Sequence, residues 1–549
     1  MRVLLVRSPS VLGRMARQNL QHPTNLLGLA SELNARGHRA TILDLEVVPG
    51  GADRLAAVLA AERPGLVGFS VVTPHVPGAA ALAAVVRRAL PDTFLIAGGP
   101  HATALPADLL DEIPELDAVC VGEGDESFPA LCAALESAAG GSARRAALDA
   151  IPGLQLRDGP ASPRDSSHGV AERRSHIADA STSGSSPGAS PSGDGPACAS
   201  TVGSHFTGAR DVLSDLDRLA PMDRSLLDWP AYERLAGHKG VASPGVIRKG
   251  IRATQIHLSR GCYAHCVFCS TNLVWGERSR PGIRRRSLPA VLEEIDRVVA
   301  DFGVNHLNFE DDIFPPTLHY LQELCTALLT RRVTWSCNAR VDGLRREHFE
   351  LMAAAGCVKI DFGVESGSER ILELNRKLVT VDKVLHVFAE SQRVGILRTA
   401  YLMLGSHVDE TPAEVEQTAA LARRIRPDYI TFTVGCPYPG TELWNQCRER
   451  GFLALLPTGR PDWKRYGYYP GLPPWRFTHF TPEQMLATQQ RVLRGFYMNP
   501  AFMLRMLARV RSVAHMKALV TAGLDVRHFL ASELGARHAR HVRDATRAG

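Results

Sequence analysis

The first 135 residues or so alternate short apolar runs with helical segments. Each apolar run is bounded by glycine, proline or an acidic residue, which is typical of buried strands. The runs cover residues 2–9, 39–46, 65–72, 93–99 and 118–124. Five strands that alternate with helices predict an α/β fold, with a doubly wound parallel sheet of the flavodoxin or Rossmann kind over residues 1–145.

The same alternation returns at about residue 249. Six strand candidates follow one another there, with helical segments between them, at 254–259, 306–311, 333–341, 358–366, 397–405 and 429–437. Six such units predict a partial (βα)6 TIM-type barrel over 249–455, with its chemistry at the carboxyl ends of the strands. The helical pattern from about residue 480 predicts a C-terminal helical region over 456–549.

The segment between the two predicted sheets has a different composition. Residues 158–210 contain hardly any large apolar side chain, so they cannot bury enough surface to offset their ordering entropy. We expect a disordered, low-complexity insertion there. Residues 211–248 are then a connector.

Composition narrows the classes of function. Lys and Arg number 63 against 57 for Asp and Glu, and this small excess is spread along the chain, so no nucleic-acid partner is expected. No stretch approaches the roughly 18 apolar residues of a membrane span, and the first apolar run is too short for a signal peptide. We expect a cytoplasmic protein, in which 11 cysteines point to metal or redox use rather than disulfides.

Three cysteines follow the first strand of the predicted barrel, at Cys262, Cys266 and Cys269. Zinc sites usually combine four protein ligands, and common ferredoxin runs space their cysteines differently, so both fit this loop poorly. A four-iron, four-sulfur cluster held by three thiolates keeps one iron free for a small molecule. An unrelated zinc site remains the alternative.

The loop resembles the CxxxCxΦC motif of radical S-adenosylmethionine enzymes, with Phe268 as the aromatic residue before Cys269. The resemblance implies that the open iron binds S-adenosylmethionine. It further implies that one electron, from an external reductant such as flavodoxin or ferredoxin, releases a 5′-deoxyadenosyl radical.

Other predicted strand ends resemble the family's S-adenosylmethionine contacts. The paired acids Asp311 and Asp312 resemble the second-strand contact to the amino group, with Glu310 beside them. Residues 402–411 and 436–443 resemble the fifth-strand and sixth-strand motifs. The full set that the resemblance implies for S-adenosylmethionine is Phe268, Glu310, Asp311, Asp312, Arg340, Glu365 and Ser366. Arg340 either faces the carboxylate or forms a barrel ion pair.

The amino-terminal sheet resembles the cobalamin-binding domain that precedes many radical S-adenosylmethionine enzymes, the class B methyltransferases among them. A GxGxxG dinucleotide fingerprint is absent. The cobalamin contacts expected at its strand ends are Ser70, Thr73, Gly98, Gly99, His101, Thr103, Gly122 and Glu123. His101 contacts the cofactor's periphery or only caps its loop, and residues 122–126 hold the cofactor's tail through their backbone or form a plain strand-to-helix turn. Because Asp-x-His-x-x-Gly is also absent, cobalamin is expected base-off, without histidine on cobalt.

The resemblance implies a methyltransferase that acts on an unactivated carbon, or a phosphinate phosphorus, of a small natural-product molecule, as in antibiotic biosynthesis. Two S-adenosylmethionine molecules are used per turnover, one as methyl source and one as radical source. The alternatives are a cyclase, rearranging or oxidative enzyme that uses cobalamin without methyl transfer, and a non-catalytic sensor. Cys337, Cys436 and Tyr438 lie near predicted strand ends and are candidate catalytic residues.

Overall fold

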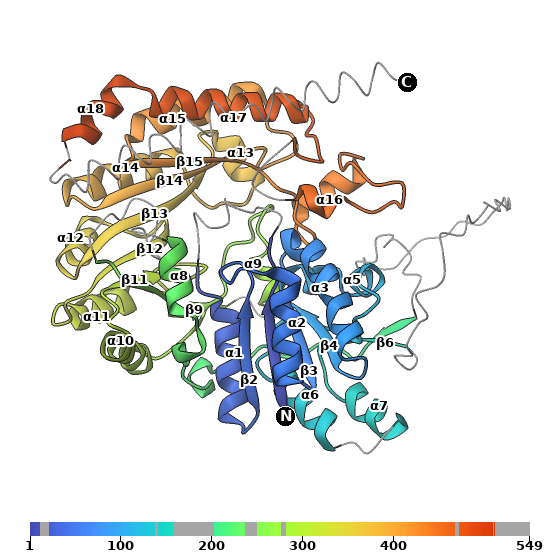
Figure 1. The fold of residues 1–549 in the computed structure, drawn as a ribbon. Coiled ribbons are helices and arrows are strands. Elements are labelled where there is room, and N and C mark those ends of the chain that lie inside the picture. The colour runs from blue at the N-terminus through green and yellow to red at the C-terminus, as the bar shows by residue number, and fades with distance from the viewer. Residues whose placement is uncertain are drawn as a thin grey trace, which may run out of the picture.

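Two parallel sheets form the protein, as seen in the computed structural model. Figure 1 shows the N-terminal sheet, with its first strands in blue, beside the second sheet, with its last strands in yellow to orange. The structure describes residues 1–10, 21–137, 141–158, 203–236, 250–275, 282–466, 472–508 and 510.

The N-terminal sheet has the strand order β2-β1-β3-β4-β5-β6-β7. Its parallel strands are β1 (Arg2–Arg7), β2 (Arg39–Asp44), β3 (Leu66–Ser70), β4 (Phe94–Gly98) and β5 (Ala118–Cys120). The helices are α1 (Thr24–Ala35), α2 (Gly51–Glu62), α3 (Val76–Ala89), α4 (Pro100–Ala104), α5 (Pro106–Glu112), α6 (Ser127–Ser137) and α7 (Gly141–Asp149). The predicted doubly wound fold is confirmed. The order reverses between β1 and β3, which is where such sheets bind ligands.

Two antiparallel strands, β6 (Leu154–Arg157) and β7 (Ser204–Phe206), extend this sheet. The prediction that all of 158–210 is disordered is therefore wrong for β7, while residues 159–202 lie outside the described residues. The composition did not predict β7, because this strand is held by its backbone pairing with β6 and not by burial of its side chains. Its Phe206 is 45% exposed.

The second sheet has the order β15-β14-β13-β12-β11-β8, with every neighbouring pair parallel. Its strands are β8 (Ala253–Ile256), β11 (His306–Phe309), β12 (Thr334–Arg340), β13 (Cys357–Glu365), β14 (Leu397–Leu404) and β15 (Tyr429–Val434). The helices that follow them are α10 (Leu288–Phe302), α11 (Leu318–Leu328), α12 (Arg346–Ala354), α13 (Glu369–Leu374), α14 (Val381–Arg393) and α15 (Pro412–Ile425). All six predicted strands are present, in the order of a partial barrel.

The C-terminal region is only partly helical. Beyond α16 (Glu442–Glu449), the described part of 456–480 has a single 3₁₀ turn, η6 (Trp463–Arg465), before α17 (Pro482–Tyr497) and α18 (Pro500–Ala508). Helices α17 and α18 confirm the helical pattern predicted from about residue 480, and the described part of 456–480 before them is not α-helical. Helix α17 packs on β15, where the Tyr497 hydroxyl donates to the Ile430 carbonyl at 2.7 Å.

The connector joins the two sheets through its turns η3 (Leu216–Arg218) and η4 (Arg224–Leu226) and helix α8 (Trp229–Ala236). Arg224 is 1% exposed and donates to Glu294 of α10 at 2.7 Å. On the other side, the Tyr232 hydroxyl donates to Asp44 of β2. These buried polar contacts fix the connector to both sheets.

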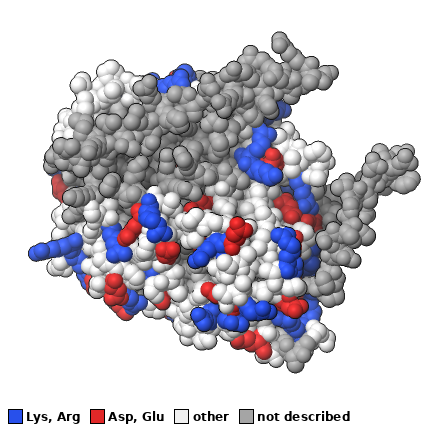
Figure 2. All heavy atoms as spheres, in the orientation of Figure 1, with Lys and Arg blue, Asp and Glu red and all other residues white. Residues whose placement is uncertain are grey.

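Charges of both signs are interspersed on the molecular face drawn in Figure 2. Within the basic run 282–287, Arg284 pairs with Glu123 and Arg286 pairs with Glu294, so these arginines are neutralised inside the fold. Among the described helices, none combines the length and apolarity needed to cross a membrane.

Candidate active site

The three cysteines lie on one loop between β9 (Ser259–Arg260) and α9 (Thr271–Val274). Cys262 and Cys266 are half-buried and Cys269 is exposed, and all three are free thiols. Burial raises the pKa of both Cys262 and Cys266. The loop thus presents three thiols that no disulfide occupies.

Asp312 links the two ends of this loop. Its carboxylate accepts the Gly261 N–H at 3.0 Å on one side of the cysteines and the Thr271 hydroxyl at 3.1 Å on the other. Gly261 itself has φ +94°, a backbone conformation that favours glycine. The loop is therefore closed at its base before any cluster is considered.

The neighbouring Asp311 is fully engaged on one oxygen and free on the other. Its Oδ1 accepts the Leu258 N–H at 2.9 Å and the Ser259 hydroxyl at 2.7 Å. Its buried Oδ2 has no partner among the described residues, and burial raises the pKa of Asp311 to about 7. Of the predicted acid pair, Asp311 keeps an acceptor for a ligand, whereas Asp312 serves the loop.

Glu310 points across the sheet toward β12. It accepts the amide of Asn338 at 3.0 Å, and burial raises its pKa. Its carboxylate does not share the contacts of Asp311 and Asp312.

Arg340 forms an ion pair in this structure. Its Nε donates to Asp342 at 2.9 Å, and its guanidinium lies 5.3 Å from the ring centre of Tyr263, whose hydroxyl donates to the same carboxylate at 2.6 Å. Of the two roles predicted for Arg340, the ion pair is therefore present. The pair lies beside the cysteine loop, to which Tyr263 belongs.

A second cation, Lys377, follows α13 in the chain, and its side chain reaches Glu365, the last residue of β13. It donates to Glu365 at 2.8 Å, and Glu365 has φ +67°, a rare conformation for a residue with a side chain. Burial raises the pKa of Cys266. The positive charge of Lys377 acts in the opposite direction and lowers this pKa, and the charge of Arg340 lowers it to a smaller extent. The cysteine loop thus faces positive charge.

Two predicted site residues have their contacts elsewhere. Ser366 is fully buried and contacts Thr418 of α15 at 3.3 Å. Cys337 is buried beside Cys357. Successive residues of a strand face opposite sides, and Arg340, three residues later, points to the loop, so Cys337 lies on the helix-covered side of β12. The prediction that Cys337 faces the cavity is wrong. Phe268 is part of the cysteine loop itself, between Cys266 and Cys269, and is half-buried against the core.

The two domains meet where β15 ends. Helix α4, which follows β4, contacts α9, which follows the cysteine loop. A Cβ on Gly440 would lie 2.4 Å from Leu273 of α9 and 3.2 Å from Ala104 of α4. The segment that contains Cys436 and Tyr438 therefore lies against both carboxyl edges, and the side chains of these two residues are hydrogen-bonded.

His101 is enclosed at the edge of the first sheet. It is 2% exposed, its Nδ1 lies 3.1 Å from the Thr73 hydroxyl, and its ring meets Trp463 edge-on at 4.8 Å. Burial lowers the pKa of His101 to about 3, so its ring is neutral. Trp463 in turn donates its indole N–H to Glu112 at 2.8 Å.

Other predicted cobalamin residues form contacts within the edge. Ser70 accepts from Asn25 at 2.8 Å, and the Thr103 hydroxyl accepts the Gly122 N–H at 3.0 Å. The side chain of Glu123 does not face an open edge, since Arg260 and Arg284 from the second domain both pair with it.

The glycines of this edge differ in what they permit. Gly99 has φ +106°, and a Cβ there would lie 2.9 Å from the Val71 carbonyl, so glycine is needed for α4 to approach β3. Gly98 has ordinary room, with Cys120 at 3.6 Å. Gly122, with φ +79°, has open space where a Cβ would stand. Open space beside a left-handed glycine suits close approach by a ligand.

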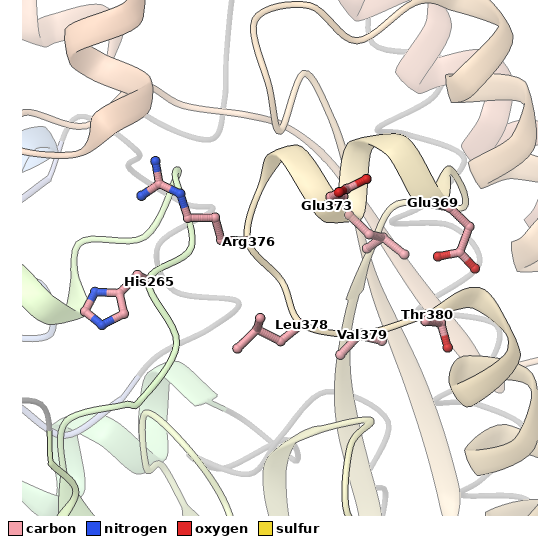
Figure 3. Close-up of a pocket in the computed structure, with 8 residues that line it drawn as sticks. His265, Glu369, Glu373, Arg376, Leu378, Val379 and Thr380 are labelled. Carbon is pink, nitrogen blue, oxygen red and sulfur yellow. The ribbon is translucent and has the colours of Figure 1, made fainter.

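A separate cavity of about 550 Å³ is lined by His265 of the cysteine loop and by residues of α13 and the segment that follows it. Figure 3 shows His265 and Arg376 on one side of it and Glu369 and Thr380 on the other. Its described lining contains none of the residues predicted to bind S-adenosylmethionine or cobalamin. This cavity is therefore not the predicted cofactor site.

Sequence reasoning did not single out Lys377 and Trp463. Lys377 had a signal, since it is a charged residue that closely follows the predicted contacts Glu365 and Ser366 in the chain. Trp463 had none, because its partners Glu112 and His101 lie more than 300 residues away in the chain.

Two family models match the chain. The B12 binding domain matches residues 14–132, and the Radical SAM superfamily matches residues 256–422. The chain belongs to the cobalamin-dependent radical S-adenosylmethionine enzymes. Both matches lie inside the two sheets predicted from the sequence.

Three curated relatives of this radical S-adenosylmethionine enzyme align over most of its length. An uncharacterized methyltransferase of Pyrococcus horikoshii is 26% identical, covering 84% of this chain and 86% of its own. The cytidylyl-2-hydroxyethylphosphonate methyltransferase of Streptomyces wedmorensis is 24% identical, covering 82% of both. An anaerobic magnesium-protoporphyrin IX monomethyl ester cyclase of Rubrivivax gelatinosus is also 24% identical, covering 86% of this chain and 73% of its own.

Two solved structures share the fold. The radical S-adenosylmethionine methyltransferase TsrM of Kitasatospora setae, with cobalamin and a [4Fe-4S] cluster bound, has a TM-score of 0.58 at 18% identity, covering 82% of this chain and 75% of its own. The cobalamin-dependent enzyme OxsB, with aqua-cobalamin and S-adenosylmethionine bound, has a TM-score of 0.66 at 16% identity, covering 96% and 71%.

The residues present fit the family's cofactors. Three free thiols on one loop beside Lys377 and Arg340 suit an anionic cluster. The unpartnered Asp311 Oδ2 suits an amino group, and the open space at Gly122 suits a bulky ligand against the first sheet.

Proposed function

We propose that this enzyme is a methyltransferase that methylates an unactivated carbon, or a phosphinate phosphorus, of a small natural-product intermediate, using two S-adenosylmethionine molecules per turnover. One observation supports this most strongly. Helix α4, which directly follows β4 at the cobalamin-binding edge, contacts α9, which directly follows the cysteine loop. A methyl donor and a hydrogen-abstracting radical must reach the same substrate atom, so their sites must open to one space.

The cysteine loop provides the radical half of this reaction. When bound, the cluster supplies the electron that cleaves S-adenosylmethionine, and cobalamin supplies a methyl group. Cys262, Cys266 and Cys269 hold the cluster. Lys377 offsets their negative charge, and Asp311 accepts a hydrogen bond from the amino group of S-adenosylmethionine.

The proposed cobalamin contacts are Ser70, Thr73, Gly98, Gly99, His101, Thr103 and Gly122, with cobalamin base-off. The enclosed position of His101, neutral and held between Thr73 and Trp463, supports a peripheral role and not cobalt ligation. Glu123 belongs to the set through its backbone alone, because two arginines occupy its carboxylate.

Tyr438 is the candidate proton or hydrogen donor to the substrate, with Cys436 beside it. Both lie on the segment that touches α4 and α9. We further propose an external one-electron donor such as flavodoxin or ferredoxin, and a cytoplasmic location, which suits reduced thiols.

Methyl-labelled S-adenosylmethionine tests this function. The anaerobically reconstituted enzyme, incubated with cell extract and a reductant, should produce a labelled small molecule together with 5′-deoxyadenosine. The variant with Cys262, Cys266 and Cys269 replaced by Ala should produce neither. Formation of 5′-deoxyadenosine without any methylated product would refute methyl transfer.

A second candidate is a cyclase or oxidative enzyme that uses cobalamin without methyl transfer. The alignment with the magnesium-protoporphyrin cyclase over 86% of this chain favours it. It predicts an unlabelled product in the same experiment, with 5′-deoxyadenosine still formed.

A further inference from the structure

A buried group of four charged side chains joins the cysteine loop to the cobalamin-binding domain. It consists of Glu123 and Asp125, which follow β5, and Arg260 and Arg284, from the paired strands β9 and β10 (Arg284–Arg285). We call it the interdomain charge cluster. Its side chains are between 4% and 19% exposed.

The geometry of the interdomain charge cluster is specific. Arg260 donates to both oxygens of Asp125, at 2.8 and 3.1 Å, and to Glu123 at 3.3 Å. Arg284 donates to both oxygens of Glu123, at 2.6 and 3.0 Å. Paired donors on a planar carboxylate fix orientation as well as distance.

The position of Arg260 in the chain gives these contacts their importance. Only Gly261 separates it from Cys262, and Asp312 holds that glycine. On the far side of the loop, Trp275 follows α9 and its ring centre lies 5.2 Å from the Arg260 guanidinium. Both ends of the cysteine loop therefore meet at one arginine.

The acidic partners belong to the other cofactor's edge. Glu123 directly follows Gly122, whose N–H donates to the Thr103 hydroxyl, and Asp125 comes two residues after Glu123. Burial tends to raise the pKa of Asp125, yet Arg260 outweighs this and lowers it. The ion pair thus stays charged, and it connects the predicted cobalamin edge rigidly to the root of the loop.

We propose that Arg260 is a positioning residue: through Asp125 and Glu123 it sets the distance and orientation of the iron–sulfur cluster relative to cobalamin. This inference rests on the proposed use of both cofactors in one reaction. Arg260 itself touches neither substrate nor the reacting atoms.

The variant Arg260→Gln removes the charge and the paired donors. Arg210→Gln is the matched control, because Arg210 binds Glu126 and Ser127 of the same acidic segment but does not contact the cysteine loop. Arg260→Lys keeps the charge and loses the fork, so it should show a smaller effect.

The readout is electron paramagnetic resonance of protein loaded with cluster and cob(II)alamin. Relaxation of the cob(II)alamin signal depends on the distance to the reduced cluster. We expect it to change in Arg260→Gln and to stay unchanged in Arg210→Gln, with iron and cobalamin contents equal to wild type. Formation of S-adenosylhomocysteine should fall about tenfold or more, because small misplacements of reacting groups are costly.

The outcomes separate this inference from the proposed function. Unchanged relaxation in Arg260→Gln overturns the positioning role, whatever the product. A changed relaxation, in an enzyme whose wild type transfers no methyl group, keeps the positioning role and rejects the methyltransferase. If Arg260→Gln does not fold, Arg260→Lys decides the question by the same measurement.

Discussion

Replacing Asp312 by alanine should make the iron–sulfur cluster labile without unfolding the protein. Asp312 accepts one hydrogen bond from each end of the cysteine loop, at 3.0 Å from Gly261 and 3.1 Å from Thr271. A hydrogen bond to a charged group contributes about 1.5–3 kcal/mol. Because the Thr271 contact is solvent-exposed, we take the lower value of this range for each of the two hydrogen bonds, which gives about 3 kcal/mol in total.

A loss of about 3 kcal/mol corresponds to roughly a hundredfold change in the equilibrium between closed and open loop. The assay is anaerobic release of iron to a chelator, followed as the loss of cluster absorbance. We expect release about a hundredfold faster in Asp312→Ala. Asp312→Asn should be less affected, since the amide oxygen still accepts from Gly261.

Asp296→Ala is the control for loss of an aspartate, because Asp296 pairs with Arg331 on the helical layer. Its iron release should match wild type. If Asp312→Ala releases iron at the wild-type rate and only binds S-adenosylmethionine more weakly, our reasoning about the loop is wrong and Asp312 is a ligand contact.

Three further predictions concern the cobalamin-binding edge. Trp463→Phe keeps an aromatic side chain, though a smaller one, and removes the indole N–H that the Glu112 carboxylate accepts, so the free energy of unfolding in urea should fall by about 1–3 kcal/mol. Gly99→Ala introduces a Cβ 2.9 Å from the Val71 carbonyl at φ +106°, and should cost about 1–3 kcal/mol and lower cobalamin content in the purified protein. His101, with its pKa lowered from 6.5 to about 3, is protonated only in the unfolded chain between these values. The contribution of His101 to the free energy of unfolding is therefore complete above pH 6.5 and about 1.4 kcal/mol smaller at pH 5.5. In urea titrations at several pH values, His101→Gln should abolish this decrease in the free energy of unfolding.

The sequence predicted both sheets because their signals are local. Apolar runs of strand length and helices between them recur along the chain, and right-handed crossovers leave few ways to arrange such units. The cysteine spacing is equally local, since all three ligands lie within eight residues. Contacts such as that between Arg260 and Asp125, 135 residues apart, have no counterpart in a local pattern.

The errors have specific physical causes. Cys337 was predicted to face the cavity because it lies near the end of its strand. A shift of one residue along a strand turns the side chain to the other face. Asn338 and Arg340, which lie one and three residues after Cys337, are the side chains that point inward. Strand β7 was missed because backbone pairing at a sheet edge needs no apolar side chain.

Three chain segments far apart in sequence converge on the carboxyl edge of the first sheet. The connector binds β2 through Tyr232, the root of the cysteine loop binds Asp125 through Arg260, and the segment before α17 contacts His101 through Trp463. Each contact joins a charged or polar group of the first domain to a part of the chain that follows it. The space between the two cofactor edges is therefore bounded by contacts that neither cofactor makes, which is what preorganised positioning of two reactive groups requires.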